Sequence, residues 1–99
     1  MSAIHERRYR LQREREVAQK RVRQTTLQYV ERYENIINDL VQQGLSQYVR
    51  EDIQLIQSQI NEIRSIATRN AFEARELSIQ VGQRIHALPR IARQLAQVE

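Results

Sequence analysis

Apolar and small side chains recur along nearly the whole chain at steps of three, four and seven residues, the spacing of one face of an α-helix. In the first half this face comprises Ile4, Leu11, Ala18, Val22, Thr25, Tyr29, Ile36 and Leu40. In the second half it comprises Ile53, Ile56, Ile60, Ile63, Ala67, Ala71, Ala74, Leu77, Val81, Ile85 and Leu88. Few segments alternate with the period of two that a half-buried strand requires. The pattern therefore predicts an all-α protein.

One glycine interrupts the repeat near its middle. Gly44 lies in the stretch "QQGLSQ" and suits the left-handed residue that ends a helix, while Ser46 suits the N-cap of the next helix. We therefore predict helices over residues 2–43 and 46–88, joined by a turn at 44–45 into a long, coiled-coil-like antiparallel hairpin. A single continuous helix is the alternative, because one glycine destabilises a helix by only about 1 kcal/mol.

Folding the chain at this turn sets apolar residues of the two helices opposite one another along nearly the whole hairpin, which would occupy residues 1–88. At the open end, Ile4 would lie near Ile85. The only two histidines, His5 and His86, would lie near the same end on opposite helices. This agreement between the two apolar patterns supports a hairpin with its turn at Gly44 over a turn at an arbitrary position.

The last residues, 89–99, are predicted to form a short, separate amphipathic helix. Pro89 suits the first turn of a new helix and is poorly tolerated inside an existing one. The apolar face of this segment comprises Ile91, Leu95 and Val98, and we expect it to dock on the hairpin or on a partner.

A second apolar stripe flanks the first on both predicted helices. It comprises Val30, Ile37, Val41, Leu55 and Ile66. A lone two-helix hairpin would leave this stripe in water, whereas two hairpins packed as a four-helix bundle would cover it. The stripe therefore predicts a homodimer, or docking of another protein on the same residues.

The net charge of +4 is unevenly distributed and raises a second possibility. Residues 1–24 contain eight basic and three acidic residues (+5). Residues 25–52 contain two basic and five acidic residues (−3), and residues 53–99 contain six basic and four acidic residues (+2). The candidate nucleic-acid-binding residues are Arg7, Arg8, Arg10, Arg13, Lys20, Arg21 and Arg23. Because these cations are scattered around the helix among glutamates, a solvated or protein-docking face is the favoured interpretation.

Nothing in the sequence indicates catalysis, a cofactor or a metal site. The chain has no cysteine and no Gly-rich phosphate loop, and its two histidines do not form an i, i+4 pair. The charged beginning lacks the apolar run of a signal peptide, and no apolar stretch approaches the roughly 20 residues of a membrane span. We therefore expect a cytoplasmic protein that is not an enzyme.

The sequence favours a non-catalytic coiled-coil module that self-associates and docks onto a larger protein complex. The first alternative is a nucleic-acid-binding hairpin that uses the Arg-rich beginning of the chain. A further alternative is a small adaptor or chaperone for an export or phage-type assembly, which would hold its client at the open end of the hairpin.

Overall fold

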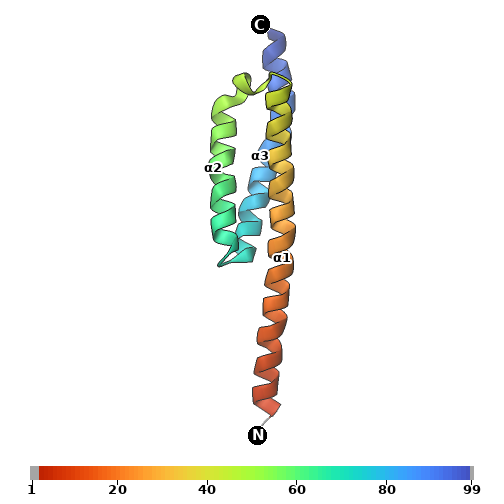
Figure 1. The fold of residues 1–99 in the computed structure, drawn as a ribbon, viewed down its shortest axis with the longest axis vertical. Helices are drawn as coiled ribbons and strands as arrows, with labels where there is room; N and C mark the ends of the chain where they lie inside the picture. Colours follow the sequence, from red (N-terminus) through yellow and green to blue (C-terminus); the bar gives the residue numbers. More distant parts are fainter. Residues whose placement is uncertain (1–2, 99) are drawn as a thin grey trace.

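The computed structural model describes the backbone of residues 3–98 and the side chains of residues 7–98, so Ser2 and Glu99 of the predicted segments lie outside it. The described elements are α1 (Ala3–Gln42), the 3₁₀ turn η1 (Ser46–Val49), α2 (Arg50–Ala67) and α3 (Ala71–Val98). Helix α2 returns along α1, and α3 then reverses direction and runs parallel to α1 (Figure 1). The result is a rod with extents of 75 × 17 × 15 Å. The predicted all-α class is confirmed, but the architecture is a three-helix bundle and not a two-helix hairpin.

The turn at Gly44 is where the sequence predicts it. Gly44 has a φ of 72°, the left-handed conformation that glycine adopts without a steric penalty. The Leu45 amide donates to the Leu40 carbonyl at 2.9 Å, and the Gly44 amide donates to the Val41 carbonyl at 3.1 Å, which together satisfy the end of α1. Ser46 does not cap α2 as expected, because a 3₁₀ turn intervenes before that helix begins.

A second turn at residues 68–70 breaks the helix predicted over 46–88. The amide of Asn70 donates to the Ile66 carbonyl at 2.7 Å and so closes α2. The Asn70 side-chain oxygen then accepts from the Glu73 amide at 3.2 Å and opens α3. An asparagine followed three residues later by a glutamate is an N-terminal capping pattern, which explains the turn without glycine or proline.

Two further predictions are corrected by the course of α3. The helix runs through Pro89 to Val98, so residues 89–99 do not begin a separate element. His86 lies beside Tyr33, with ring centroids 6.2 Å apart in an edge-to-face arrangement, and not at an open end of the rod. The position of His86 follows from the parallel course of α1 and α3.

The core of the bundle is built by all three helices, and this changes the meaning of the second apolar stripe. Val30, Ile37 and Ile66 expose 0%, 4% and 5% of their surface, because α3 packs over the face that a two-helix hairpin would leave in water. These three residues are therefore core residues and not the predicted docking surface. The chain itself covers most of the stripe that the sequence assigns to a dimer.

The packing of α3 against α1 depends on one glycine. The hydroxyl of Tyr33 donates to the carbonyl of Ser78 at 2.9 Å, across the interface. A Cβ atom at Gly82 would lie only 2.5 Å from that hydroxyl oxygen, so the glycine makes room for the tyrosine. Burial raises the pKa of Tyr33, with a smaller contribution from Tyr29, so the hydroxyl remains a donor at neutral pH.

Thr26 carries a buried hydroxyl without a hydrogen-bond partner. We expect Thr26→Val to raise the free energy of unfolding by about 1 kcal/mol, because it removes an unsatisfied polar group at nearly constant volume. Thr25→Val is the matched control, since the Thr25 hydroxyl is exposed and donates to the Arg21 carbonyl at 3.0 Å. Urea unfolding of the two variants checks this, and a loss of stability in Thr26→Val would contradict it.

Candidate functional site

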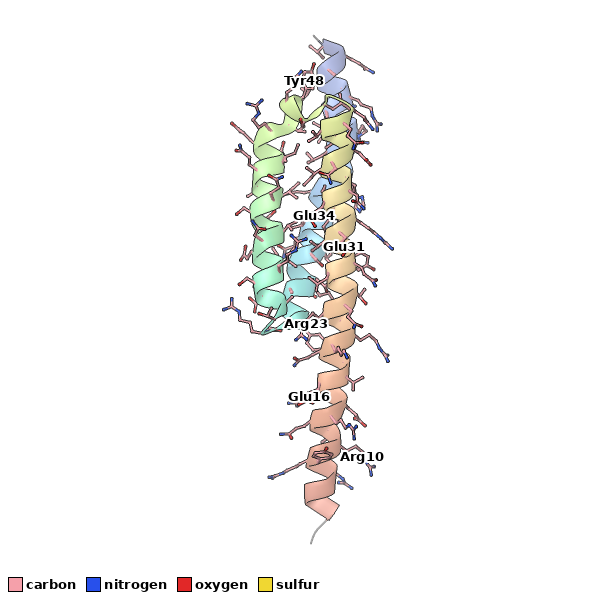
Figure 2. All side chains as sticks on the ribbon, viewed as in Figure 1. Arg10, Glu16, Arg23, Glu31, Glu34 and Tyr48 are labelled. Atoms are coloured by element: carbon pink, nitrogen blue, oxygen red, sulfur yellow. The ribbon has the colours of Figure 1, made fainter. Side chains whose placement is uncertain are left out.

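The first half of α1 leaves the bundle and continues alone. Figure 1 shows α1 extending well beyond the point where α2 ends and α3 begins. We call residues 3–22 the arm, and every side chain from Arg7 to Ala18 is exposed. Arg10 and Glu16 point into solvent with no other helix beside them (Figure 2). This projecting helix is the largest part of the described chain that has no intramolecular partner.

The arm is uncovered because the core face of α1 becomes polar there. Thr26, Val30 and Tyr33 face the core of the bundle. Continued toward the N-terminus at helical spacing, the same face presents Gln19, Arg15, Gln12 and Arg8. Burying these side chains against another helix of the chain would desolvate polar groups without hydrophobic gain. The arm is rich in Arg, Gln and Glu, which are strong helix formers and favour a helical conformation where no other helix packs against it.

Cations occupy every side of the arm. At about 100° per residue they form three rows that lie roughly 120° apart around the helix. The rows are Arg8 with Arg15, Arg13 with Lys20, and Arg7 with Arg21. Arg10 lies close to the third row. Glu6, Glu14 and Glu16 reduce the charge of the arm, and Glu14 lies within the third row, but they do not divide the arm into a basic and an acidic face.

These cations have no carboxylate partner among the described side chains. The ion pair that the structure describes lies in the bundle, where Arg64 of α2 contacts Glu34 of α1. Arg23, one of the predicted nucleic-acid-binding residues, is engaged structurally: its Nε atom donates to the Ala67 carbonyl at 2.6 Å and caps the end of α2. Arg23 therefore marks the boundary between bundle and arm (Figure 2).

A small hollow, which we call the foot hollow, lies where α3 begins beside α1. It has a volume of about 230 Å³ and is lined by Arg21, Val22, Thr25, Thr26, Tyr29 and Arg75. Arg75 comes from α3 and joins the cations of the arm although it lies 54 positions after Arg21 in the sequence. Sequence reasoning did not select Arg75, because only the second turn brings it to this place.

Two groups of exposed apolar residues lie toward the two ends of the rod, and Tyr29, Phe72 and Ile79 are exposed between them. On the arm, Tyr9, Leu11 and Val17 expose 66%, 55% and 53% of their surface. At the other end of the rod, near the first turn and along the end of α3, the predicted docking residues Val41, Leu55, Ile91, Leu95 and Val98 are also exposed. They are distributed over three helices (α1, α2 and α3).

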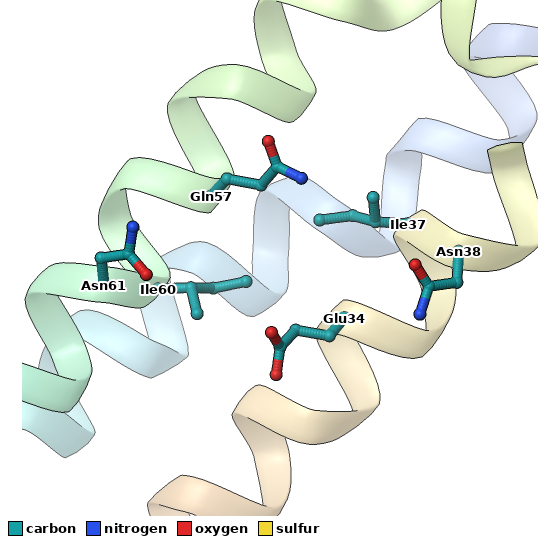
Figure 3. Close-up of a pocket in the computed structure, with 6 residues that line it drawn as sticks. All are labelled: Glu34, Ile37, Asn38, Gln57, Ile60 and Asn61. Carbon is teal, nitrogen blue, oxygen red and sulfur yellow. The ribbon is translucent and has the colours of Figure 1, made fainter.

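The remaining surface offers little for chemistry. Between α1 and α2 an open groove is lined by Glu34, Asn38, Gln57 and Asn61 above Ile37 and Ile60 (Figure 3). Its amides are ordinary hydrogen-bonding groups, and they lie beside the ion pair of Glu34 with Arg64. Among the described residues no three potential metal ligands come together. No helix formed by the described residues is long and apolar enough to cross a membrane.

Comparison with known proteins gives no relative for this arrangement. No protein-family model, no curated protein and no solved structure matches the chain.

Proposed function

We propose that this protein is a non-catalytic interaction module, in which the three-helix bundle holds and orients a helical docking arm for attachment to a larger complex. The observation that carries the proposal is the arm itself: α1 runs on for residues 3–22 with its described side chains from Arg7 to Ala18 exposed. An enzyme is disfavoured, because the charged residues of the arm are spread around a helix and are not gathered around a concave site.

The bundle and the arm have different roles, folding and binding. The bundle buries its core, including Val30, Ile37 and Ile66, within one chain. The arm carries seven cations between Arg7 and Arg21 and three exposed apolar side chains, a combination that is typical of binding surfaces and unnecessary for folding. Docking therefore remains the proposal, while self-association through Val30, Ile37 and Ile66 is abandoned.

The adaptor or chaperone alternative has lost the feature on which it depended. It required an open end between two long helices that could hold a client. In the bundle α3 begins at Ala71 and runs away from the arm, so a single helix projects at that end (Figure 1).

The proposal is tested by a pull-down from the lysate of the source organism with three forms of the tagged full chain. The arm variant combines Arg10→Gln, Arg13→Gln and Arg21→Gln. Its matched control removes the same charge from α3 with Arg84→Gln, Arg90→Gln and Arg93→Gln, and glutamine preserves helix propensity in both.

We expect the wild type and the α3 variant to recover the same stoichiometric partner, protein or nucleic acid, and the arm variant to lose it. A partner that survives in the arm variant and is lost from the α3 variant would contradict the proposal. Each lysate is tested with and without nuclease, which separates protein partners from nucleic acid.

A further inference from the structure

We infer that the partner of the arm is duplex DNA, with the arm lying lengthwise in the major groove and Arg21 and Arg75 holding a backbone phosphate at the foot hollow. This inference rests on the proposed docking role and names its ligand. The steps that lead to it are the location of the charge, its distribution around the helix, and the dimensions of the arm.

The net charge of the protein resides almost entirely in the arm. Residues 3–22 contain seven Lys or Arg and three Glu (+4), whereas the other residues sum to zero (+1 from Arg23, −3 from residues 25–52 and +2 from residues 53–99). A second copy of the chain is therefore a poor occupant of the arm, because two such helices side by side would repel each other. A polyanion is favoured, since each neutralised phosphate releases condensed counterions and strengthens binding.

The distribution of the cations selects among polyanions. A protein or membrane surface meets one side of a helix, and would leave two of the three cation rows in solvent. The DNA major groove has phosphates along both walls and bases at its floor, so it encloses a helix on several sides. Rows at roughly 120° place Arg8 with Arg15, Arg13 with Lys20 and Arg7 with Arg21 toward different parts of such a groove.

The dimensions of the arm agree with this placement. An α-helix with its side chains is about 10–12 Å wide, and the major groove of B-DNA is about 12 Å wide. The arm of residues 3–22 is about 30 Å long, which is enough for a straight helix to reach both walls of the groove. The major groove of duplex RNA is too narrow for side chains to read, so RNA is not the expected ligand.

The side chains of the arm suit contacts with both the bases in the major groove and the phosphates of the DNA backbone. All but one of the cations between Arg7 and Arg21 are arginines, whose planar guanidinium binds phosphate and guanine in a bidentate manner. Tyr9, Leu11 and Val17 are exposed among them and can contact the methyl groups of thymine. At the foot hollow, Arg21 and Arg75 come from two helices and flank one small cavity, where a phosphate can be held between them.

The test is fluorescence anisotropy with the full chain and a labelled mixed-sequence DNA duplex of about 20 base pairs, titrated at several salt concentrations. Three double variants each remove one row: Arg8→Gln with Arg15→Gln, Arg13→Gln with Lys20→Gln, and Arg7→Gln with Arg21→Gln. Arg84→Gln with Arg90→Gln on α3 is the control of equal charge.

If five phosphates are neutralised, the dissociation constant of the wild type should rise about 500-fold between about 50 and 200 mM salt, and that of each row variant about 40-fold. All three row variants should be weakened to a similar degree, and the α3 control should behave as the wild type. Arg75→Gln lies outside the arm and should still reduce the salt slope by about 0.9.

Three results would overturn the inference. Weakening by only one of the three row variants would indicate a flat partner surface, and tighter binding of an RNA duplex of the same sequence would exclude the major groove of DNA. If the protein binds no DNA at about 50 mM salt, DNA is excluded as the ligand, whether or not the protein binds the acidic polypeptide poly-L-glutamate. In each case a partner whose capture in the pull-down depends on the arm would leave the proposed docking function intact.

Discussion

Replacing Ile66 with alanine should lower the free energy of unfolding by about 3 kcal/mol. Ile66 lies near the end of α2 and is 5% exposed in the core that the three helices share. The substitution removes buried methyl and methylene groups and leaves a cavity that the surrounding helices can only partly close. Equilibrium unfolding in urea, followed by circular dichroism, measures the change.

Leu55→Ala is the matched control for this prediction. Leu55 belongs to the same helix and to the same predicted second stripe, but it is 46% exposed. Its replacement should change the free energy of unfolding by less than about 1 kcal/mol. Equal effects of the two substitutions would contradict the burial of Ile66 by α3, because a two-helix hairpin places both residues on one exposed face.

Replacing Gly82 with alanine should destabilise the protein by about 2 kcal/mol, although alanine is the better helix former. The new Cβ would approach the Tyr33 hydroxyl oxygen to 2.5 Å, so the ring must move away from its place between α1 and α3. That movement also weakens the hydrogen bond from Tyr33 to the Ser78 carbonyl. The loss of stability should appear as a lower midpoint of thermal and urea unfolding.

A double-mutant cycle with Tyr33→Phe identifies the cause. Without the hydroxyl, the nearest ring atom of residue 33 would lie about 3.2 Å from the new Cβ, the present distance to Cζ, and a small shift relieves that contact. Gly82→Ala should therefore destabilise the Tyr33→Phe protein less than it destabilises the wild type. The same cost in both backgrounds would show that the close approach of Tyr33 is not responsible.

Much of the helical structure could be predicted from the sequence, because it depends on local signals. The apolar repeat predicts long helices, and Gly44 predicts the end of the first one within two residues. A glycine flanked by long stretches of strong helix formers is a local signal that tertiary packing did not override.

The second turn was missed because the apolar repeat continues across it. Ile63, Ala67, Ala71 and Ala74 keep helical spacing through residues 68–70, so the core face shows no interruption where the chain reverses. The available signal was the capping pattern of Asn70 and Glu73, which is weaker than a glycine or proline. Without this turn, the predicted hairpin leaves the face that α3 covers exposed to water. The second stripe was therefore assigned to a second copy of the chain or to another protein.

The candidate site was only partly predictable for the same reason. The Arg-rich stretch is visible in the sequence, and so is the polar interruption of the core face at Arg8 and Arg15. Its isolation from the rest of the chain is not visible, because it depends on where α3 begins. Arg75 and the foot hollow likewise exist only once α3 lies parallel to α1.

The parallel course of α1 and α3 is the central claim, since it covers the second stripe and leaves the arm free. The most direct test is a distance measurement between spin labels in the cysteine-free chain carrying Gln28→Cys and Gln83→Cys, both at exposed positions. The bundle places these residues on adjacent helices, whose axes lie about 8–10 Å apart, and so predicts a short distance even with flexible labels. A two-helix hairpin would separate them by about 22 residues along the rod, or about 33 Å, and a distance in that range would contradict the account.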